Sequence, residues 1–211
     1  FSSADQPIAD QGVIVAGDIP GTWTASPNAA ADEKKSLKLA ASTKGCTDYV
    51  KFAKANLATT HAASDDFSSA AEAQISNHSY VHADAAAATQ ALDALRSSTV
   101  PACLSKVFTT ALENELAKDP AARRRIRNYE LTMEPVNAAL GSYPTVAYKG
   151  TVTVNLKSGA TQSLNVALIA VQVDRVVLAY SVQAPPTGVN DLNTALNSAP
   201  LATATRTSNA L

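Results

Sequence analysis

The sequence is short of charged, aromatic and cysteine residues. Of its 211 residues, 17% are charged and 5% are aromatic, and 17 Lys and Arg nearly balance 18 Asp and Glu. A nucleic-acid partner would require a strongly basic face, so this balance argues against nucleic-acid binding. Globular domains typically carry about a quarter charged residues. Because cytosolic proteins usually have more Lys and Glu than this, the composition favours an extracytoplasmic location.

A hydrophobic run of membrane length is also missing. A bilayer crossing takes about 20 predominantly apolar residues. The most apolar stretch, Leu164 to Val182, is interrupted by polar residues that include Asn165, Gln172, Asp174 and Arg175. We therefore expect no transmembrane segment in this chain. The polar residues that follow Phe1 indicate that a signal peptide or lipid anchor, where the protein has one, lies upstream of it.

The motifs of common enzyme chemistries are absent as well. Residues 141–144 lack the second glycine of the hydrolase nucleophile elbow, and no glycine-rich phosphate loop precedes a helix. His78 and His82 are four residues apart, but a junction between a strand and a helix is expected between them, so we predict no metal site. We expect a non-enzymatic protein without a cofactor. A hydrolase with an unrecognised site is the alternative.

Cys46 and Cys103 are the only cysteines. Neither belongs to a C-x-x-C unit or has a histidine at metal-ligand spacing. A distant pair fits one structural disulfide made in an oxidising compartment, whereas two buried free thiols in a cytosolic protein are the alternative. We predict the disulfide, which would tie segment 46–57 to the start of a helix over 101–117. Closing so long a loop should contribute roughly 4 kcal/mol of stability.

The first half of the chain has helical periodicity. Asp84 stands where an N-cap belongs, and Leu92 and Leu95 share one face, which predicts a helix over 85–95. A one-faced apolar pattern predicts the helix over 101–117, which Asp119-Pro120 ends or kinks. The remaining expectations are an irregular leader over 1–19, a strand at 22–24, helix or loop over 28–45, a short helix over 46–57, a loop over 58–69 and a strand over 71–81.

In the second half the hydrophobic period changes to two. Apolar residues alternate with Thr, Lys and Asn over 145–156, where Gly150 suggests a bend or bulge. We predict an antiparallel meander of strands 145–156, 162–173 and 175–183. A strand near 128–134 precedes it, and a helix from Val189, which Pro200 ends or bends, follows it. The residues expected on the helix-covered face of the meander are Val146, Tyr148, Val152, Val154 and Leu178.

Together these elements predict the fold class α+β. Residues 20–211 are expected to form a single domain, in which helices pack on one face of an antiparallel sheet that contains the C-terminal three-strand meander. The Thr, Lys and Asn face of strand 145–156 should then be wet or should line a groove.

The basic cluster of Arg123, Arg124 and Arg125 is the strongest charge feature. It could bind an anionic headgroup or phosphate if it lines a groove; otherwise it is a solvated helix end. Trp23 and Tyr80 are further candidate ligand contacts, because aromatic rings can stack on a ligand. The segment 77–79 matches the N-glycosylation pattern, which often occurs by chance.

The order of these pieces resembles a family of secreted or lipid-anchored actinobacterial proteins. They are related to the extracellular sensor domain of the mycobacterial receptor Ser/Thr kinase PknH. The resemblance covers roughly residues 20–211 and rests on Trp23 after a glycine turn, Cys46, the strand ending in Tyr80-Val81, the helix over 84–95, Cys103-Leu104 and the meander over 145–183. The kinase sensor has two disulfides, whereas this chain can form only one.

The resemblance implies a compact α+β domain with a cleft, which lies outside the cytoplasmic membrane and binds an unidentified ligand. This chain contains no kinase, so a free-standing solute-binding or envelope protein is expected rather than a signalling receptor. We therefore expect an extracytoplasmic domain that binds a small molecule, lipid or glycan. The alternative is a cell-envelope structural or protein-interaction module with an envelope protein as its partner.

Overall fold

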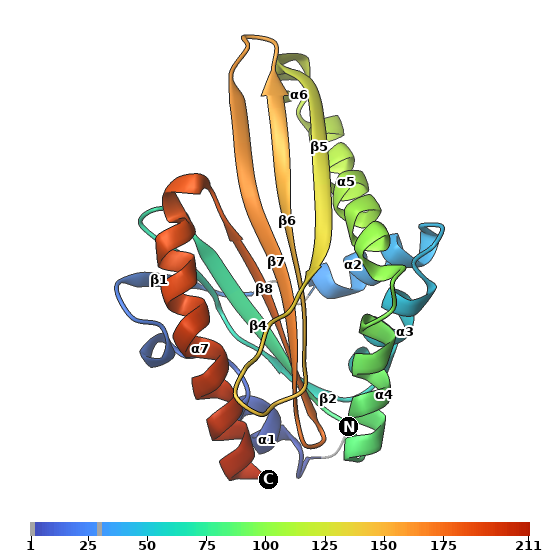
Figure 1. Cartoon of the computed structure of the whole chain (residues 1–211), viewed down its shortest axis with the longest axis vertical. Coiled ribbons are helices and arrows are strands. Elements are labelled where there is room, and N and C mark those ends of the chain that lie inside the picture. The colour runs from blue at the N-terminus through green and yellow to red at the C-terminus, as the bar shows by residue number, and fades with distance from the viewer. Residues whose placement is uncertain (1–2, 29–30) are drawn as a thin grey trace.

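An antiparallel sheet forms the centre of the computed structural model, which describes residues 3–28 and 31–211 (Figure 1). Its eight strands are β1 (Trp23–Ser26), β2 (Thr60–Ala63), β3 (Asp66–Ser69), β4 (Gln74–Val81), β5 (Ile126–Val136), β6 (Thr145–Leu156), β7 (Thr161–Val173) and β8 (Val176–Ala184). They are ordered β1-β3-β4-β8-β7-β6-β5, and β2 also pairs with β4. The α+β class and the predicted meander, β6-β7-β8, are thus confirmed.

Helices surround this sheet. They are α1 (Gln6–Gln11), α2 (Ala31–Ser42), α3 (Thr47–Leu57), α4 (Ala85–Leu95), α5 (Val100–Lys118), α6 (Pro120–Arg125) and α7 (Val189–Ala210), with short 3₁₀ turns at Ala16–Asp18 and Pro186–Gly188. Within the described parts of the chain, none of the helices combines the length and hydrophobicity that a membrane crossing requires. The α1 helix and the C-terminal end of α7 lie at the same end of the molecule (Figure 1).

The helices cover both faces of the sheet, which corrects the expectation of one covered face. Tyr148 and Val177 pack with residues of α3, α4 and α5, and we call this side the α5 face. Leu178 and Tyr180 pack with residues of α1 and α7, on the α7 face. Neighbouring residues of a strand point to opposite faces. Leu178 therefore lies opposite Val146 and Tyr148, not beside them. Its face was not predictable, because β8 is buried on both sides and shows no clean alternation.

The leader, expected to be irregular over 1–19, is ordered over residues 3–19, and residues 1–2 lie outside the described residues. It forms α1 and a 3₁₀ turn, and it buries Ala9, Ile14 and Ile19 against the α7 face. The fully buried side chain of Asn77 holds it there, donating to the Gly12 carbonyl oxygen (2.7 Å) and accepting from the Ile14 N–H (2.8 Å). A helix of six residues is too short for a periodic signal and depends on such tertiary contacts. The glycosylation pattern at 77–79 is thus occupied by a structural asparagine.

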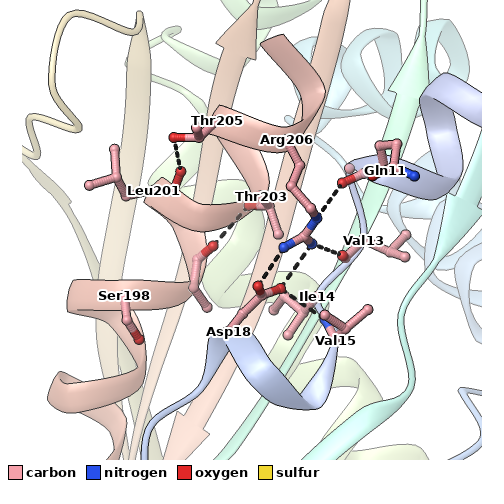
Figure 2. A network of polar contacts seen from close by, with 12 residues as sticks. Gln11, Val13, Ile14, Val15, Asp18, Ser198, Leu201, Thr203, Thr205 and Arg206 are labelled. Carbon is pink, nitrogen blue, oxygen red and sulfur yellow. Dashed lines mark hydrogen bonds and ion pairs between the residues drawn. The ribbon is translucent and has the colours of Figure 1, made fainter. Parts of the chain in front are cut away.

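Figure 2 shows how α7 holds the same leader. The Arg206 guanidinium forms an ion pair with both Asp18 carboxylate oxygens and donates to the carbonyl oxygens of Gln11 (3.2 Å) and Val13 (2.7 Å). Asp18 in turn accepts from the Val15 N–H (2.9 Å). One side chain near the end of the chain therefore fixes three points near its beginning.

The predicted loop over 58–69 contains the strands β2 and β3 instead. Both pair with β4, end to end along the same edge. Between them Ser64 binds Asn77 twice, through backbone N–H to carbonyl oxygen and through its hydroxyl to the Asn77 N–H (both 2.9 Å). Strands of four residues are too short to show an alternating pattern, and β4 holds both of them in place. The strand expected over 71–81 begins only at Gln74, because a turn with Glu72 at φ 64° precedes it.

The helices follow the predictions more closely. The α4 helix has its predicted bounds, and Asp84 accepts from the Ala87 N–H (2.8 Å). The α5 helix ends at Lys118, and Asp119 caps α6 through the N–H groups of Ala121 and Ala122. The ambiguous segment 28–45 holds α2, while residues 29–30 lie outside the described residues. Pro200 does not end α7, which continues to Ala210.

Cys46 and Cys103 are bonded, as predicted, with an S–S distance of 2.12 Å. The bond joins the N-cap of α3 to the first turn of α5. Gly150, by contrast, makes no bulge, since the register of β6 is continuous there. It permits a close approach instead, because a Cβ at this position would lie 2.2 Å from the Thr132 carbonyl oxygen.

Candidate ligand-binding groove

A groove of about 1070 Å³ lies on the α7 face. Its floor is the outward surface of β5, β6 and β7, one wall is α7, and the loop over 137–144 adds to its border. In Figure 1 this loop crosses in front of the sheet beside α7. The volume is at the upper end of the range of small-molecule pockets, which is about 300–1000 Å³. We call this site the α7 groove.

The floor of the α7 groove combines apolar side chains, such as Ala167 and Ile169, with the polar Thr and Lys side chains predicted for this face of strand 145–156. Lys149 and Thr151 contribute from β6, Thr132 from β5 and Asn165 from β7. Lys149 forms an exposed ion pair with Glu134 across the β5–β6 pair (3.1 Å). The Asn165 amide donates to the Ala184 carbonyl oxygen (3.4 Å), which holds this side chain on the floor. The site therefore presents hydroxyl, amide and ammonium groups in a row.

The wall that α7 contributes is amphipathic. Asn193 and Asn197 are exposed and lie four residues apart, so they share one side of the helix. Leu192 and Leu196 line the same groove, opposite Ile169 of the floor. A ligand in the groove would meet amides and apolar side chains together. The loop over 137–144 contributes Leu140 and Gly141.

The structure does not bring the predicted ligand contacts into this groove. The three arginines, Arg123, Arg124 and Arg125, are exposed in α6 and line neither this groove nor three further pockets of about 820, 580 and 370 Å³. Anion binding was expected only if these arginines line a groove. Since they do not, they form a solvated helix end. Trp23 lies in the outer strand β1, donates to the Pro20 carbonyl oxygen (3.1 Å) and lines none of these pockets either.

Tyr80 lies on the other side of the sheet. It is buried on the α5 face, where its ring stacks with that of His78 (centroids 5.9 Å apart). It lines a separate pocket of about 370 Å³ between the sheet and helices α2, α3 and α5. Tyr80 and Trp23 are therefore not parts of one site.

The histidines form no metal centre in the part of the chain that the structure describes, where no cluster of three His, Cys, Asp or Glu residues could hold a metal ion. His82 is buried, and its Nε2 lies 2.9 Å from the Asn56 side-chain oxygen. Burial lowers the pKa of His82 below its usual 6.5, because desolvation disfavours the charged ring.

The sequence analysis missed the contribution of α7 to the site. The spacing of Asn193 and Asn197 could have revealed it, because two amides four residues apart lie on one side of a helix. The contribution of the loop over 137–144 had no comparable signal. No protein-family model matches the chain, and neither does any curated protein. The assignment of the α7 groove therefore rests on its geometry.

Proposed function

We propose that this protein is an extracytoplasmic ligand-binding domain, sensor-like or solute-binding, that acts without catalysis. The α7 groove carries this proposal, because it is a large hollow in which polar groups and apolar side chains converge. The disulfide supports a location outside the reducing cytosol. The resemblance to kinase sensor domains supports binding as the mode of action.

The residues that line the α7 groove indicate the chemical character of its ligand. Thr151 and Asn165 offer hydrogen bonds from the floor, Asn197 offers them from α7, and Leu196 and Ile169 offer apolar contact. A suitable ligand has a hydrogen-bonding surface on one side and an apolar surface on the other. Within the expected classes of small molecule, lipid and glycan, this favours an amphipathic molecule over a highly charged one, since Lys149 is already paired with Glu134.

The alternative function, an envelope structural or protein-interaction module, would use the open edge of the sheet. β5 is that edge. Pro135 in β5 lacks a backbone N–H, and the strand also carries the exposed charges Arg127, Glu130 and Glu134. Proline and charge oppose the addition of a further strand. We therefore favour the groove over the edge.

A thermal-shift screen against envelope lipids, glycans and small metabolites tests the proposal. A ligand that binds only the folded chain, at 100 times its Kd, stabilises it by about 2.7 kcal/mol. In a chain of this size the melting temperature then rises by about 5–10 °C. We expect Thr151→Trp, which fills the α7 groove, to abolish the shift. Val152→Trp is the matched control, because Val152 is the next residue of β6 and faces the other side of the sheet.

Catalysis is tested on the same variants. Turnover of a model ester, glycoside or peptide that disappears when a single groove residue is changed would contradict a function by binding alone. A ligand that stabilises Thr151→Trp as much as the unaltered chain would contradict the assignment of the site.

A further inference from the structure

A second groove, of about 820 Å³, lies on the α5 face and is independent of the proposed function. It runs between the helices α2 and α5 and the strands β5, β6 and β7. We call it the α5 groove. The two grooves thus lie back to back on the same three strands.

The floor of the α5 groove is a row of apolar side chains. Leu131, Val152 and Leu164 are direct cross-strand partners, so they stand side by side on one face. Phe108 and Leu112 of α5 form one wall, and Leu39 of α2 contributes to the other. The row is only half-buried, and Phe108 keeps 40% of its surface exposed. A contiguous apolar surface of this kind is typical of a binding site.

The rim of this groove is basic. Lys35 and Lys38 line it from α2, and Lys118 lines it from the end of α5. Glu115 is the one acidic residue among the described side chains of the lining, and it is paired with Lys118 (2.6 Å). Lys38 is exposed on α2 and adds a further positive charge to the rim.

We propose that the α5 groove binds a fatty acid. Its acyl chain lies on the row of Leu131, Val152 and Leu164, and its carboxylate meets Lys38 of α2 at the rim. The apolar floor selects a hydrocarbon chain, and the basic rim selects an anionic headgroup over a neutral or cationic one. The ligand is a single-chain amphiphile, because the volume lies within the range of small-molecule pockets.

Calorimetric titration of the full chain with dodecanoate, below its micelle concentration, tests this proposal. We expect saturable binding of one molecule per chain. Each methylene removed should weaken binding about fourfold, so decanoate should bind about 16-fold less tightly than dodecanoate. Dodecan-1-ol should bind less tightly than dodecanoate. Lys38→Glu should weaken dodecanoate about two- to fivefold and leave dodecan-1-ol unchanged.

Two variants locate the site. Val152→Trp fills the α5 groove and should abolish dodecanoate binding, whereas Thr151→Trp fills the α7 groove and should leave it unchanged. If Val152→Trp fails to fold, as judged by circular dichroism and melting, Phe108→Asp replaces it. Phe108 is already partly exposed, so the fold tolerates a charge there, and the charge should still repel the carboxylate.

The opposite pattern would overturn the proposal. Dodecanoate that binds Val152→Trp or Phe108→Asp as well as the unaltered chain does not occupy the α5 groove. Binding lost only in Thr151→Trp would place the lipid in the α7 groove, which supports the proposed function and contradicts this inference. An absence of binding, or binding that does not depend on chain length, contradicts it as well.

Discussion

At the residue scale, a few polar residues hold segments that local propensity would not fix. Asn77 binds the leader through its side chain and the bend between β2 and β3 through its backbone. Arg206 binds the leader from α7 (Figure 2). The Asn77 side chain satisfies buried backbone groups of the leader that would otherwise lack a partner, which is costly. The stability of the N-terminal segment therefore depends on very few atoms.

Arg206→Met should strongly destabilise the protein. Asp18, with a side chain only 7% exposed, would lose its counter-ion, and breaking such a pair from one side costs about 3 kcal/mol. Arg96→Met is the matched control, because the Arg96–Asp93 pair is exposed and should contribute less than about 1 kcal/mol. Urea unfolding of both variants measures the difference. Equal losses of unfolding free energy in the two variants would show that the Arg206–Asp18 pair contributes no more than an exposed pair.

His82 predicts a pH dependence of stability. Its pKa in the folded chain lies below its usual 6.5. The unfolded chain therefore binds a proton first as the pH falls. The free energy of unfolding should be at its full value above about pH 6.5 and should decrease as the pH falls from there towards the lower pKa of the folded chain.

Replacing His82 isolates this effect. His82→Asn should be less stable at pH 7, because it loses the contact with Asn56. It should also show a smaller loss of stability between pH 6.5 and pH 5 than the unaltered chain does. Denaturant titrations at these pH values measure both quantities. An unchanged pH slope in the variant would exclude His82 as the group responsible.

At the element scale, the sequence predicts long helices and strands, whose hydrophobic pattern repeats several times, and misses the short ones. The α4 helix and the strands of the meander show many periods of their pattern, and their bounds agree with the prediction within a residue or two. The α1 helix and the strands β2 and β3 span at most six residues each, and neighbours far away in the sequence hold them. No local pattern could have revealed them.

The candidate site also has a part that the sequence predicts and a part that it does not. The polar face of β6 followed from alternation, whereas its apposition to α7 depends on how the C-terminal helix packs. Residues that are conspicuous in the sequence were poor indicators of the ligand contacts. Three consecutive arginines and a tryptophan stand out in a chain poor in charge and aromatics, yet they lie in a helix end and an outer strand.

The disulfide should stabilise the assembly of elements without shaping any one of them. Closing the loop between Cys46 and Cys103, 57 residues apart, is worth about 4 kcal/mol in the chain-entropy treatment. The double variant Cys46→Ser, Cys103→Ser should melt about 10 °C lower. Its far-ultraviolet circular dichroism at room temperature should match that of the unaltered chain. A loss of helix signal at room temperature would mean that the bond is needed to form α3 or α5.

At the scale of the whole molecule, one sheet separates two hollows of different chemistry. The floor of the α7 groove includes Thr, Lys and Asn side chains and that of the α5 groove a row of Leu and Val, because successive residues of β5, β6 and β7 point to opposite faces. Thr151 and Val152 are neighbours in β6 and line different grooves, so substitutions at these two positions allow the grooves to be compared directly. A tryptophan at either position fills one groove and leaves the other open.

Native mass spectrometry of the protein purified from its own source tests the central claim, binding in the α7 groove, most directly. The unaltered chain, Thr151→Trp and Val152→Trp would be produced in that source and compared without added ligand. The account predicts a bound molecule of defined mass on the unaltered chain and on Val152→Trp, and its loss from Thr151→Trp. A fatty acid in the α5 groove would instead be lost from Val152→Trp and kept by Thr151→Trp. The account is contradicted if no bound molecule is lost selectively from Thr151→Trp.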